Sequence, residues 1–160
     1  MAETEKTNVM RLLEQSGISF DAVGYEVDES DLSGGHAAEA LGLSPDIVYK
    51  TLVAKGDKKG YLVFCLPVLE ELDLKKAAHA AGDKRVELLP LKDLLSVTGY
   101  LRGGCSPIGM KKQFPTYIEE TCELYDKIYI SAGKRGRQVG LSPEALLKYI
   151  GAEQADLIQE

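Results

Sequence analysis

A chain of 160 residues is long enough for one domain that buries about 70% of its unfolded surface, so we expect residues 1–160 to form a single domain. Hydrophobic residues at 44% and charged residues at 28% are ordinary globular frequencies, which excludes the disordered and fibrous classes. The formal net charge of −6 argues against broad, nonspecific binding to a polyanion, because such binding depends on lysine and arginine. Any nucleic acid would therefore be contacted locally or be delivered by another protein.

Neither a membrane span nor a metal site is expected. The longest apolar runs cover residues 47–54 and 61–69, well short of the roughly 20 residues that cross a bilayer. The first residues lack the basic and apolar regions of a secretory signal, which favours the cytoplasm. Cys65, Cys105 and Cys122 are widely spaced and show no zinc-ligand pattern with the two histidines, so reduced thiols are expected.

The first part of the chain alternates helix and strand signals. Apolar residues recur at helical spacing within residues 4–16, and Gly17 would end that helix. Residues 18–25 alternate as a short strand does, and residues 26–33 are polar, which is typical of a loop. Residues 34–42 indicate a second helix that a glycine ends.

The strongest local signal in the chain is a β-hairpin. Ser44-Pro45-Asp46 marks a helix or turn start, with serine as N-cap and proline at the first position. Residues 47–54 and 61–67 are rich in β-branched and aromatic side chains, and the five residues 56–60 between them include glycine. The near-continuous hydrophobicity of both segments predicts strands that are buried on both faces.

Helices and strands then follow in irregular alternation. Residues 73–82 give the clearest helix signal, with Asp73 as N-cap and a terminal glycine. The other expected elements are a strand at 86–89, a helix at 90–98, paired strands at 127–133 and 138–141, and a helix at 142–150. Since the strongest pair is a hairpin, these elements predict an α+β fold, with a mixed or mainly antiparallel sheet and helices outside it.

Residues 99–112 contain four glycines and a proline without being of low complexity. Glycine lets the backbone adopt positive φ and lets another molecule approach main-chain N–H groups, and proline fixes one dihedral angle. For any single glycine an ordinary turn is the alternative. Because two lysines end the run and apolar segments flank it, the pattern favours a binding loop whose wall is backbone.

Lys50 interrupts a strand that otherwise has the pattern of a buried one. Burial of an ammonium group without a partner is costly, so this lysine needs an explanation. One explanation is that its side chain reaches an exposed face or the sheet edge. The other is a cation that lines a pocket and holds a carboxyl, carbonyl or phosphate oxygen of a ligand.

Other catalytic motifs find little support. Ser106 has no Gly-x-Ser-x-Gly elbow and no assigned base, and Cys105 has no motif that would activate its thiol, which favours packing. Neither histidine has a catalytic context, and neither phosphate-loop pattern occurs. The cluster Lys134-Arg135-Gly136-Arg137 is the one basic patch able to touch a phosphate backbone locally, and a solvated turn is its ordinary interpretation.

Three separate motifs together resemble one known family. They are Tyr49-Lys50-Thr51-Leu52, the glycine loop from Gly99 to Lys112, and Ser131-Ala132-Gly133-Lys134-Arg135-Gly136. In order and spacing they resemble the YbaK family of the aminoacyl-tRNA editing superfamily, in particular the Cys-tRNA(Pro) deacylases. The resemblance covers nearly the whole chain and implies a mixed sheet curled toward a barrel and flanked by helices, with no metal and no cofactor.

The resemblance also implies an activity. It suggests a trans-editing enzyme that removes cysteine wrongly attached to proline tRNA by prolyl-tRNA synthetase. The acceptor end of the aminoacyl-tRNA and the synthetase would be its partners. The family suggests that the substrate thiol attacks its own carbonyl, so that cysteine leaves as a small thiolactone. Two alternatives stay open: an editing enzyme for Ala, Ser or Pro on tRNA, and a non-catalytic relative that binds an aminoacyl nucleotide.

The matching motifs carry the family's site residues onto this chain. Lys50 would be the cation at the aminoacyl ester, with Thr51 beside it, and Tyr25 and Ser131 would be further pocket groups. The backbone wall around the aminoacyl group and the terminal adenosine would consist of Gly103, Gly104, Ser106, Pro107, Ile108 and Gly109.

The chain departs from relatives at three places. Val27 stands where histidine is frequent, Tyr49 stands where phenylalanine is frequent, and Gln138 lies near the position where a pocket carboxylate is expected. No acidic pocket residue is therefore assigned.

Overall fold

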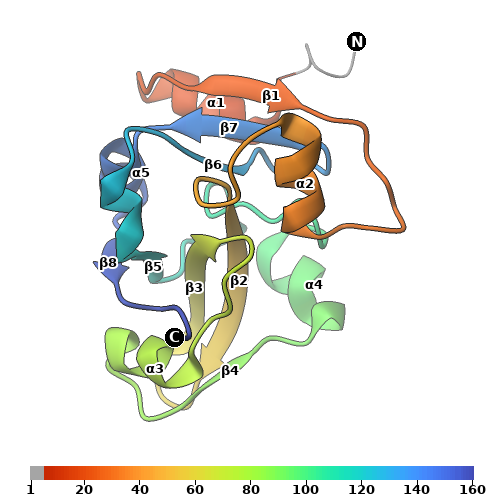
Figure 1. Ribbon diagram of the computed structural model, residues 1–160. Coiled ribbons are helices and arrows are strands. Elements are labelled where there is room, and N and C mark those ends of the chain that lie inside the picture. Colours follow the sequence, from red (N-terminus) through yellow and green to blue (C-terminus); the bar gives the residue numbers. More distant parts are fainter. Residues whose placement is uncertain (1–5) are drawn as a thin grey trace.

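In the computed structural model, which describes residues 6–160, the strands form two sheets (Figure 1). The first sheet is antiparallel and has the order β1 (Asp21–Gly24), β7 (Arg137–Leu141), β6 (Ile128–Ser131). The second has the order β4 (Val86–Leu88), β2 (Tyr49–Gly56), β3 (Gly60–Pro67), β5 (Thr116–Glu119), β8 (Glu153–Ala155). In it β2 pairs antiparallel with β3 and β4, whereas β5 pairs parallel with β3 and β8.

The two sheets meet where β2 begins. Val48 forms an isolated parallel bridge with Tyr129 of β6, and the Tyr129 N–H donates to the Ile47 carbonyl at 2.8 Å. In Figure 1 the first sheet lies across the upper end of the β2–β3 hairpin. Lys50, the second residue of β2, therefore lies close to this junction.

Side-chain caps define most of the helix starts. Thr7, Ser33, Asp73 and Ser142 each accept a backbone N–H in the first turn of a helix, as the sequence predicts for Asp73 and Ser142. The helices are α1 (Asn8–Gln15), α2 (Gly34–Leu41), α3 (Leu74–Ala81), α4 (Leu94–Thr98) and α5 (Pro143–Ile150), with 3-10 segments η2 (Leu91–Asp93) and η3 (Glu120–Leu124). Within residues 6–160, no helix has the length and apolar character that crossing a membrane requires.

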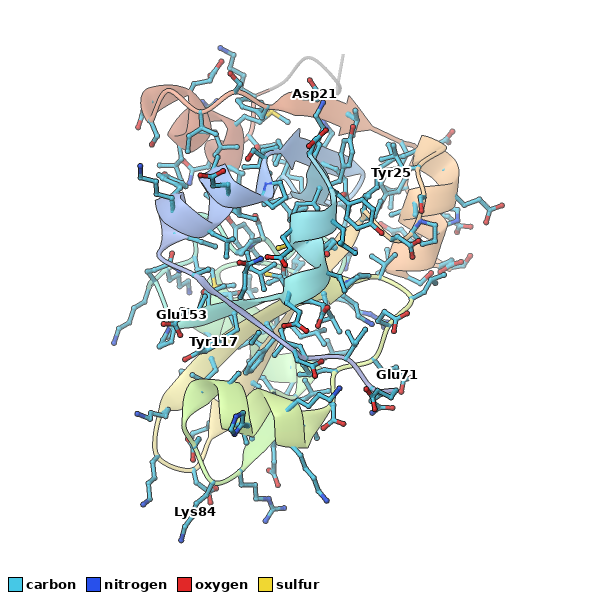
Figure 2. The ribbon with its side chains drawn as sticks, turned by 60° about the vertical axis from the view of Figure 1, so that its left-hand side comes forward. Asp21, Tyr25, Glu71, Lys84, Tyr117 and Glu153 are labelled. Carbon is cyan, nitrogen blue, oxygen red and sulfur yellow. The ribbon has the colours of Figure 1, made fainter. Side chains whose placement is uncertain are left out.

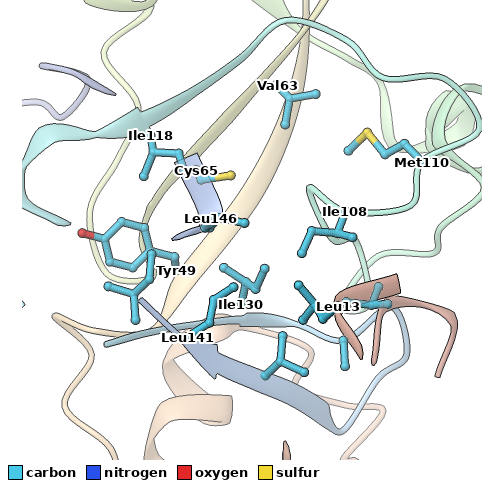
Figure 3. Close-up of a cluster of buried hydrophobic side chains, with 14 of the residues drawn as sticks. Leu13, Tyr49, Val63, Cys65, Ile108, Met110, Ile118, Ile130, Leu141 and Leu146 are labelled. Carbon is cyan, nitrogen blue, oxygen red and sulfur yellow. The ribbon is translucent and has the colours of Figure 1, made fainter. Parts of the chain in front are cut away.

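The main hydrophobic core lies between the two sheets and includes residues of α1 and α5 (Figure 3). Its buried members include Leu13, Tyr49, Cys65, Ile108, Ile118, Ile130, Leu141 and Leu146. A second cluster packs the alanine face of α3 on the β2–β3 hairpin, and a third packs Ala38 of α2 against Val48 and Tyr129. All three clusters contain residues of β2 or of the segment that leads into it, so the junction of the sheets is held by packing from several sides.

Most of the expected elements are confirmed. The structure contains the predicted hairpin, the β6–β7 pair, the helices α1, α2, α3 and α5, and the short helix α4 before Gly99. The fold is α+β with mainly antiparallel strand pairing. The part of the first predicted helix at residues 4–5 lies outside the described residues. The sequence did not predict β5 or β8, and Ser44 begins a turn. The strands divide into two sheets, and closure toward a barrel stays a prediction, as does the single-domain assignment.

Candidate functional site

A cavity of about 440 Å³ lies at the junction of the two sheets. Its wall is formed by the start of β2, the start of α2, facing residues of β6 and β7, the loop at 102–105, and leucines of β4, η2 and α4. The polar side chains in this wall belong to Tyr25, Ser33, Tyr49, Lys50, Thr51, Arg102, Cys105, Ser131 and Gln138. This volume lies within the usual range for small-ligand sites, about 300–1,000 Å³.

Lys50 places an ammonium group in the cavity wall. Its side chain is half-buried, and desolvation lowers the pKa of its amine, while the nearby carboxylates of Glu71 and Glu70 act in the opposite direction. No hydrogen bond or ion pair joins the ammonium to another residue in the part of the chain that the structure describes. The cation that looked out of place in a buried strand thus faces a cavity, where its N–H donors are open to a ligand oxygen.

The first sheet supplies the polar groups from the other strands of the wall. Ser131 of β6 and Gln138 of β7 are directly opposite each other in the strand pair, and both line the cavity. Ser131 Oγ accepts the Gly133 N–H at 3.1 Å. Gln138 is 8% exposed, and its Oε1 is buried without a hydrogen-bond partner. An unpaired buried amide is costly, so this position is suited to a ligand with complementary polar atoms.

Tyr25 follows β1 and completes this wall. Its backbone N–H donates to the Gly136 carbonyl at 2.9 Å, and its ring makes an edge contact with His36, at 6.2 Å between ring centroids. Burial raises the pKa of the Tyr25 hydroxyl, so the neutral phenol is the form present near neutral pH. Figure 2 shows Tyr25 beside α2 at the upper end of the molecule.

The first half of the glycine loop reaches the cavity. Arg102, Gly103 and Cys105 line it, and Gly103 has φ +86°, in the left-handed region that favours glycine. Gly104 packs closely on the turn between β6 and β7, where an added Cβ would lie 3.1 Å from the backbone nitrogen of Arg135. Burial raises the pKa of the Cys105 thiol to about 12, which leaves it protonated and a poor nucleophile.

The second half of the loop is packed into the core. Ser106 is 0% exposed and Ile108 is 1% exposed, and Ser106 Oγ accepts the Ile108 N–H at 3.3 Å. The Tyr100 hydroxyl donates to the Ile108 carbonyl at 2.5 Å. An added Cβ at Gly109 would lie 2.9 Å from the Tyr100 hydroxyl oxygen and 3.2 Å from Leu12 of α1. These contacts fasten the loop to the protein interior.

The structure therefore divides the predicted site residues into two groups. Brought together at the cavity are Tyr25, Lys50, Thr51, Gly103 and Ser131. Outside the cavity lining are Gly104, Ser106, Pro107, Ile108 and Gly109, although each lies in the same loop as Gly103. The roles of both groups stay predictions. Sequence reasoning left Gln138 unassigned, and a polar residue in a strand that otherwise has a buried pattern is the signal that points to it.

The chemistry of the lining is limited. Of the described residues, no Asp, Glu or His lines the cavity, and no group of three such side chains or cysteines within residues 6–160 could hold a metal ion. The wall can therefore orient a ligand and stabilise negative charge on an oxygen through Lys50. It offers no nucleophile paired with a general base.

Comparison with known proteins agrees with the geometry. The model of the family described as "Aminoacyl-tRNA editing domain" matches residues 34–149. The "Putative Cys-tRNA(Pro)/Cys-tRNA(Cys) deacylase EbsC" of Enterococcus faecalis is 49% identical over 153 residues, which are 96% of this chain and 93% of that protein. A segment that is 17% of the "Proline--tRNA ligase" of Shouchella clausii is 31% identical to 62% of this chain.

A solved structure extends the comparison to three dimensions. The crystal structure of a "putative trans-editing enzyme for prolyl tRNA synthetase" superposes with a TM-score of 0.83 at 27% identity, and the match covers 95% of each chain.

Proposed function

This chain belongs to the aminoacyl-tRNA editing domain family, and we propose that it is a trans-editing deacylase that removes cysteine wrongly attached to tRNA(Pro). The strongest support for the substrate is the relative named for Cys-tRNA(Pro) and Cys-tRNA(Cys), because it is 49% identical over almost the entire length of both chains. Because aminoacyl-tRNA is used by ribosomes in the cytoplasm, the protein is proposed to act there.

The observation that carries the proposal is the Lys50 ammonium in a cavity without a carboxylate partner. An aminoacyl ester offers one strong acceptor, the carbonyl oxygen, which becomes negatively charged when the carbonyl carbon is attacked. Lys50 would hold that oxygen, and the desolvation that lowers the pKa of its amine would also strengthen the interaction. One preorganised donor of this kind contributes about 3 kcal/mol to the transition state.

The nucleophile in this scheme comes from the substrate. The cysteinyl sulfur attacks the ester carbonyl carbon, a C–S bond forms, and the bond from that carbon to the ribose oxygen breaks. The thiol proton ends on the departing ribose hydroxyl, so no further reactant is needed. Cys105 is unsuited to replace the substrate thiol, since burial raises its pKa to about 12.

Ser131, Gln138 and Tyr25 are proposed to orient the aminoacyl group from the first sheet. Gly103 would form part of the wall, and the packed second half of the loop, from Ser106 to Gly109, would hold that wall in place. Positioning of this kind raises the effective concentration of the attacking thiol at the carbonyl. Thr51, whose hydroxyl lies 3.7 Å from Cys65 Sγ, is proposed to contact the substrate beside Lys50.

Prolyl-tRNA synthetase is the proposed partner. The net charge of −6 gives the chain little general attraction for tRNA, so delivery of the mischarged tRNA by the synthetase would help capture it. Sedimentation of the protein with prolyl-tRNA synthetase, with and without tRNA(Pro), tests this. Co-sedimentation is expected, and separate migration in both mixtures would contradict the partnership.

A panel of charged tRNAs tests the activity. Deacylation is expected for Cys-tRNA(Pro) and not for Ala-, Ser- or Pro-tRNA(Pro), because only cysteine carries a thiol that can attack its own ester. Release of Ala, Ser or Pro at a comparable rate would favour the other editing enzyme. Binding of an aminoacyl-adenosine analogue without turnover of any substrate would favour a non-catalytic relative.

A further inference from the structure

We propose that Arg102 and Arg135 form an anion site at the mouth of the cavity, and that this site binds the phosphodiester on the 5′ side of the terminal adenosine. The inference rests on the proposed function, because it names the next contact of the same substrate. It assigns a role to Arg135 of the cluster Lys134-Arg135-Gly136-Arg137, which neither lines the cavity nor takes part in the proposed reaction.

The Arg135 side chain is held against the main chain of Arg102. Arg135 Nε donates to the Arg102 carbonyl at 2.7 Å, which fixes the Arg135 guanidinium against the loop that enters the cavity. The stem of Arg135 lies 3.4 Å from the position a Cβ would take on Gly103. Arg102 itself is exposed and lines the cavity. Arg135 is not part of the cavity lining, but it contacts two residues that are, Arg102 and Gly103.

No carboxylate in the described part of the chain forms an ion pair with either arginine. An acidic segment is close, because Leu32 lies 3.6 Å from the position a Cβ would take on Gly103. Two of its carboxylates accept hydrogen bonds within the segment itself: Asp31 accepts the Ser33 N–H at 3.1 Å, and Asp28 accepts the Ser30 N–H at 2.9 Å.

The part of the substrate that suits these two arginines is a phosphodiester. An aminoacyl ester on the terminal ribose has one anionic group near it, the phosphate on the 5′ side of the same nucleotide. When the ester is at Lys50, the rest of the acceptor end must leave through the mouth of the cavity. The planar guanidinium binds phosphate oxygens in pairs, which a surface lysine cannot do. Local contacts of this kind need no overall positive charge.

Two small substrates test the site. One is the cysteinyl ester of adenosine, and the other is the cysteinyl ester of adenosine 5′-(methyl phosphate), which adds only the diester. For the native protein, kcat/KM is expected to be at least tenfold higher for the second substrate, since hydrogen bonds between ionised groups are stronger than those between neutral groups. Arg102→Gln and Arg135→Gln are each expected to reduce this ratio severalfold, and Arg135→Lys to retain more of it than Arg135→Gln.

Lys84→Gln is the matched control, because it removes the same charge at the end of the molecule opposite Tyr25 (Figure 2). It is expected to leave the ratio unchanged. With Cys-tRNA(Pro), the slope of log KM against log salt should flatten by about 0.7 for each phosphate that an arginine variant no longer binds.

The outcomes separate this inference from the proposed function. A native protein that cleaves both esters with equal kcat/KM overturns the anion site and leaves the deacylase intact. A ratio that both glutamine variants keep at the native value overturns the assignment to these arginines. Failure of the native protein to cleave either ester or Cys-tRNA(Pro) contradicts the proposed function itself.

Discussion

The two halves of the glycine loop, adjacent in sequence, occupy different environments. Arg102, Gly103 and Cys105 line the cavity, whereas Ser106 and Ile108 are buried in the protein interior. One continuous motif therefore contributes both to the cavity wall and to the packed interior. Substitutions of Arg102 or Gly103 should therefore change activity, and substitutions in the second half should change the free energy of unfolding.

Ile108→Ala gives the sharpest test of the packed half. Ile108 is 1% exposed in the main core, and truncation of such a side chain costs about 2–5 kcal/mol. Urea unfolding followed by circular dichroism measures this loss. Leu101→Ala is the control in the same loop, because Leu101 is 54% exposed and should change stability by no more than about 0.5 kcal/mol. An equal loss in the free energy of unfolding for the two variants would contradict the division of the loop into a cavity half and a packed half.

The pH dependence of deacylation tests the cavity side. Desolvation lowers the pKa of Lys50, so kcat/KM should fall as pH rises through a value below that of an exposed lysine, by about tenfold per unit. The activity of Lys50→Arg should not show this fall, because arginine stays charged. An activity that follows the titration of an ordinary exposed lysine would contradict the placement of Lys50 in a desolvated wall.

The pH dependence that Lys50 gives to the free energy of unfolding is opposite in direction to the pH dependence of activity. A lysine whose pKa is lowered by folding binds fewer protons in the folded state than in the unfolded state between the two pKa values. The contribution of Lys50 to the free energy of unfolding therefore rises with pH across that interval, while activity falls. Comparison of native protein and Lys50→Met by urea unfolding at several pH values isolates this term, and a contribution that falls with pH would contradict it.

Tyr100→Phe should produce a smaller loss of stability in the packed half. The variant leaves the Ile108 carbonyl without the hydroxyl donor at 2.5 Å, which costs about 1 kcal/mol. Tyr125→Phe is a matched control, since the Tyr125 hydroxyl makes no hydrogen bond to any residue from 6 to 160. A thermal unfolding midpoint that falls for Tyr125→Phe as much as for Tyr100→Phe would argue against the fastening role of Tyr100.

Cys105→Ser is expected to have the smallest effect. The thiol lines the cavity but stays protonated, so its loss should change kcat/KM by less than about threefold. Alkylation of Cys105 by iodoacetamide near neutral pH should be slow for the same reason, and mass spectrometry of the modified peptide measures it. A much larger loss of activity would indicate that the enzyme thiol takes part in the reaction.

Local signals were sufficient for most of the fold. The hairpin was visible because both strands are nearly continuous apolar runs, and Asp73 and Ser142 marked helix starts through their own side-chain chemistry. The strands β5 and β8 carried no such signal. They are short, and β8 pairs only at the edge of the sheet, so their conformation depends on pairing with residues far away in the chain.

The site was only partly visible for a related reason. Lys50 was found because a charge in an apolar strand is anomalous, and the structure places it at a cavity. A motif gives the order of residues and not the direction in which each one points, so the sequence could not separate Gly103 from Ile108. Gln138 lies opposite Ser131 only because β6 pairs with β7, and the register of that pairing cannot be read from either segment alone.

The most direct test of the proposed chemistry is deacylation of Cys-tRNA(Pro) by Lys50→Ala, measured with the free energy of unfolding of the same preparation. Lys50 makes no hydrogen bond or ion pair with another residue in the described part of the chain, and desolvation disfavours its charge, so its removal should leave the fold at least as stable as before. We predict a loss of activity of about 10²–10³ without a loss of stability. A folded Lys50→Ala variant with native activity would contradict the role of Lys50.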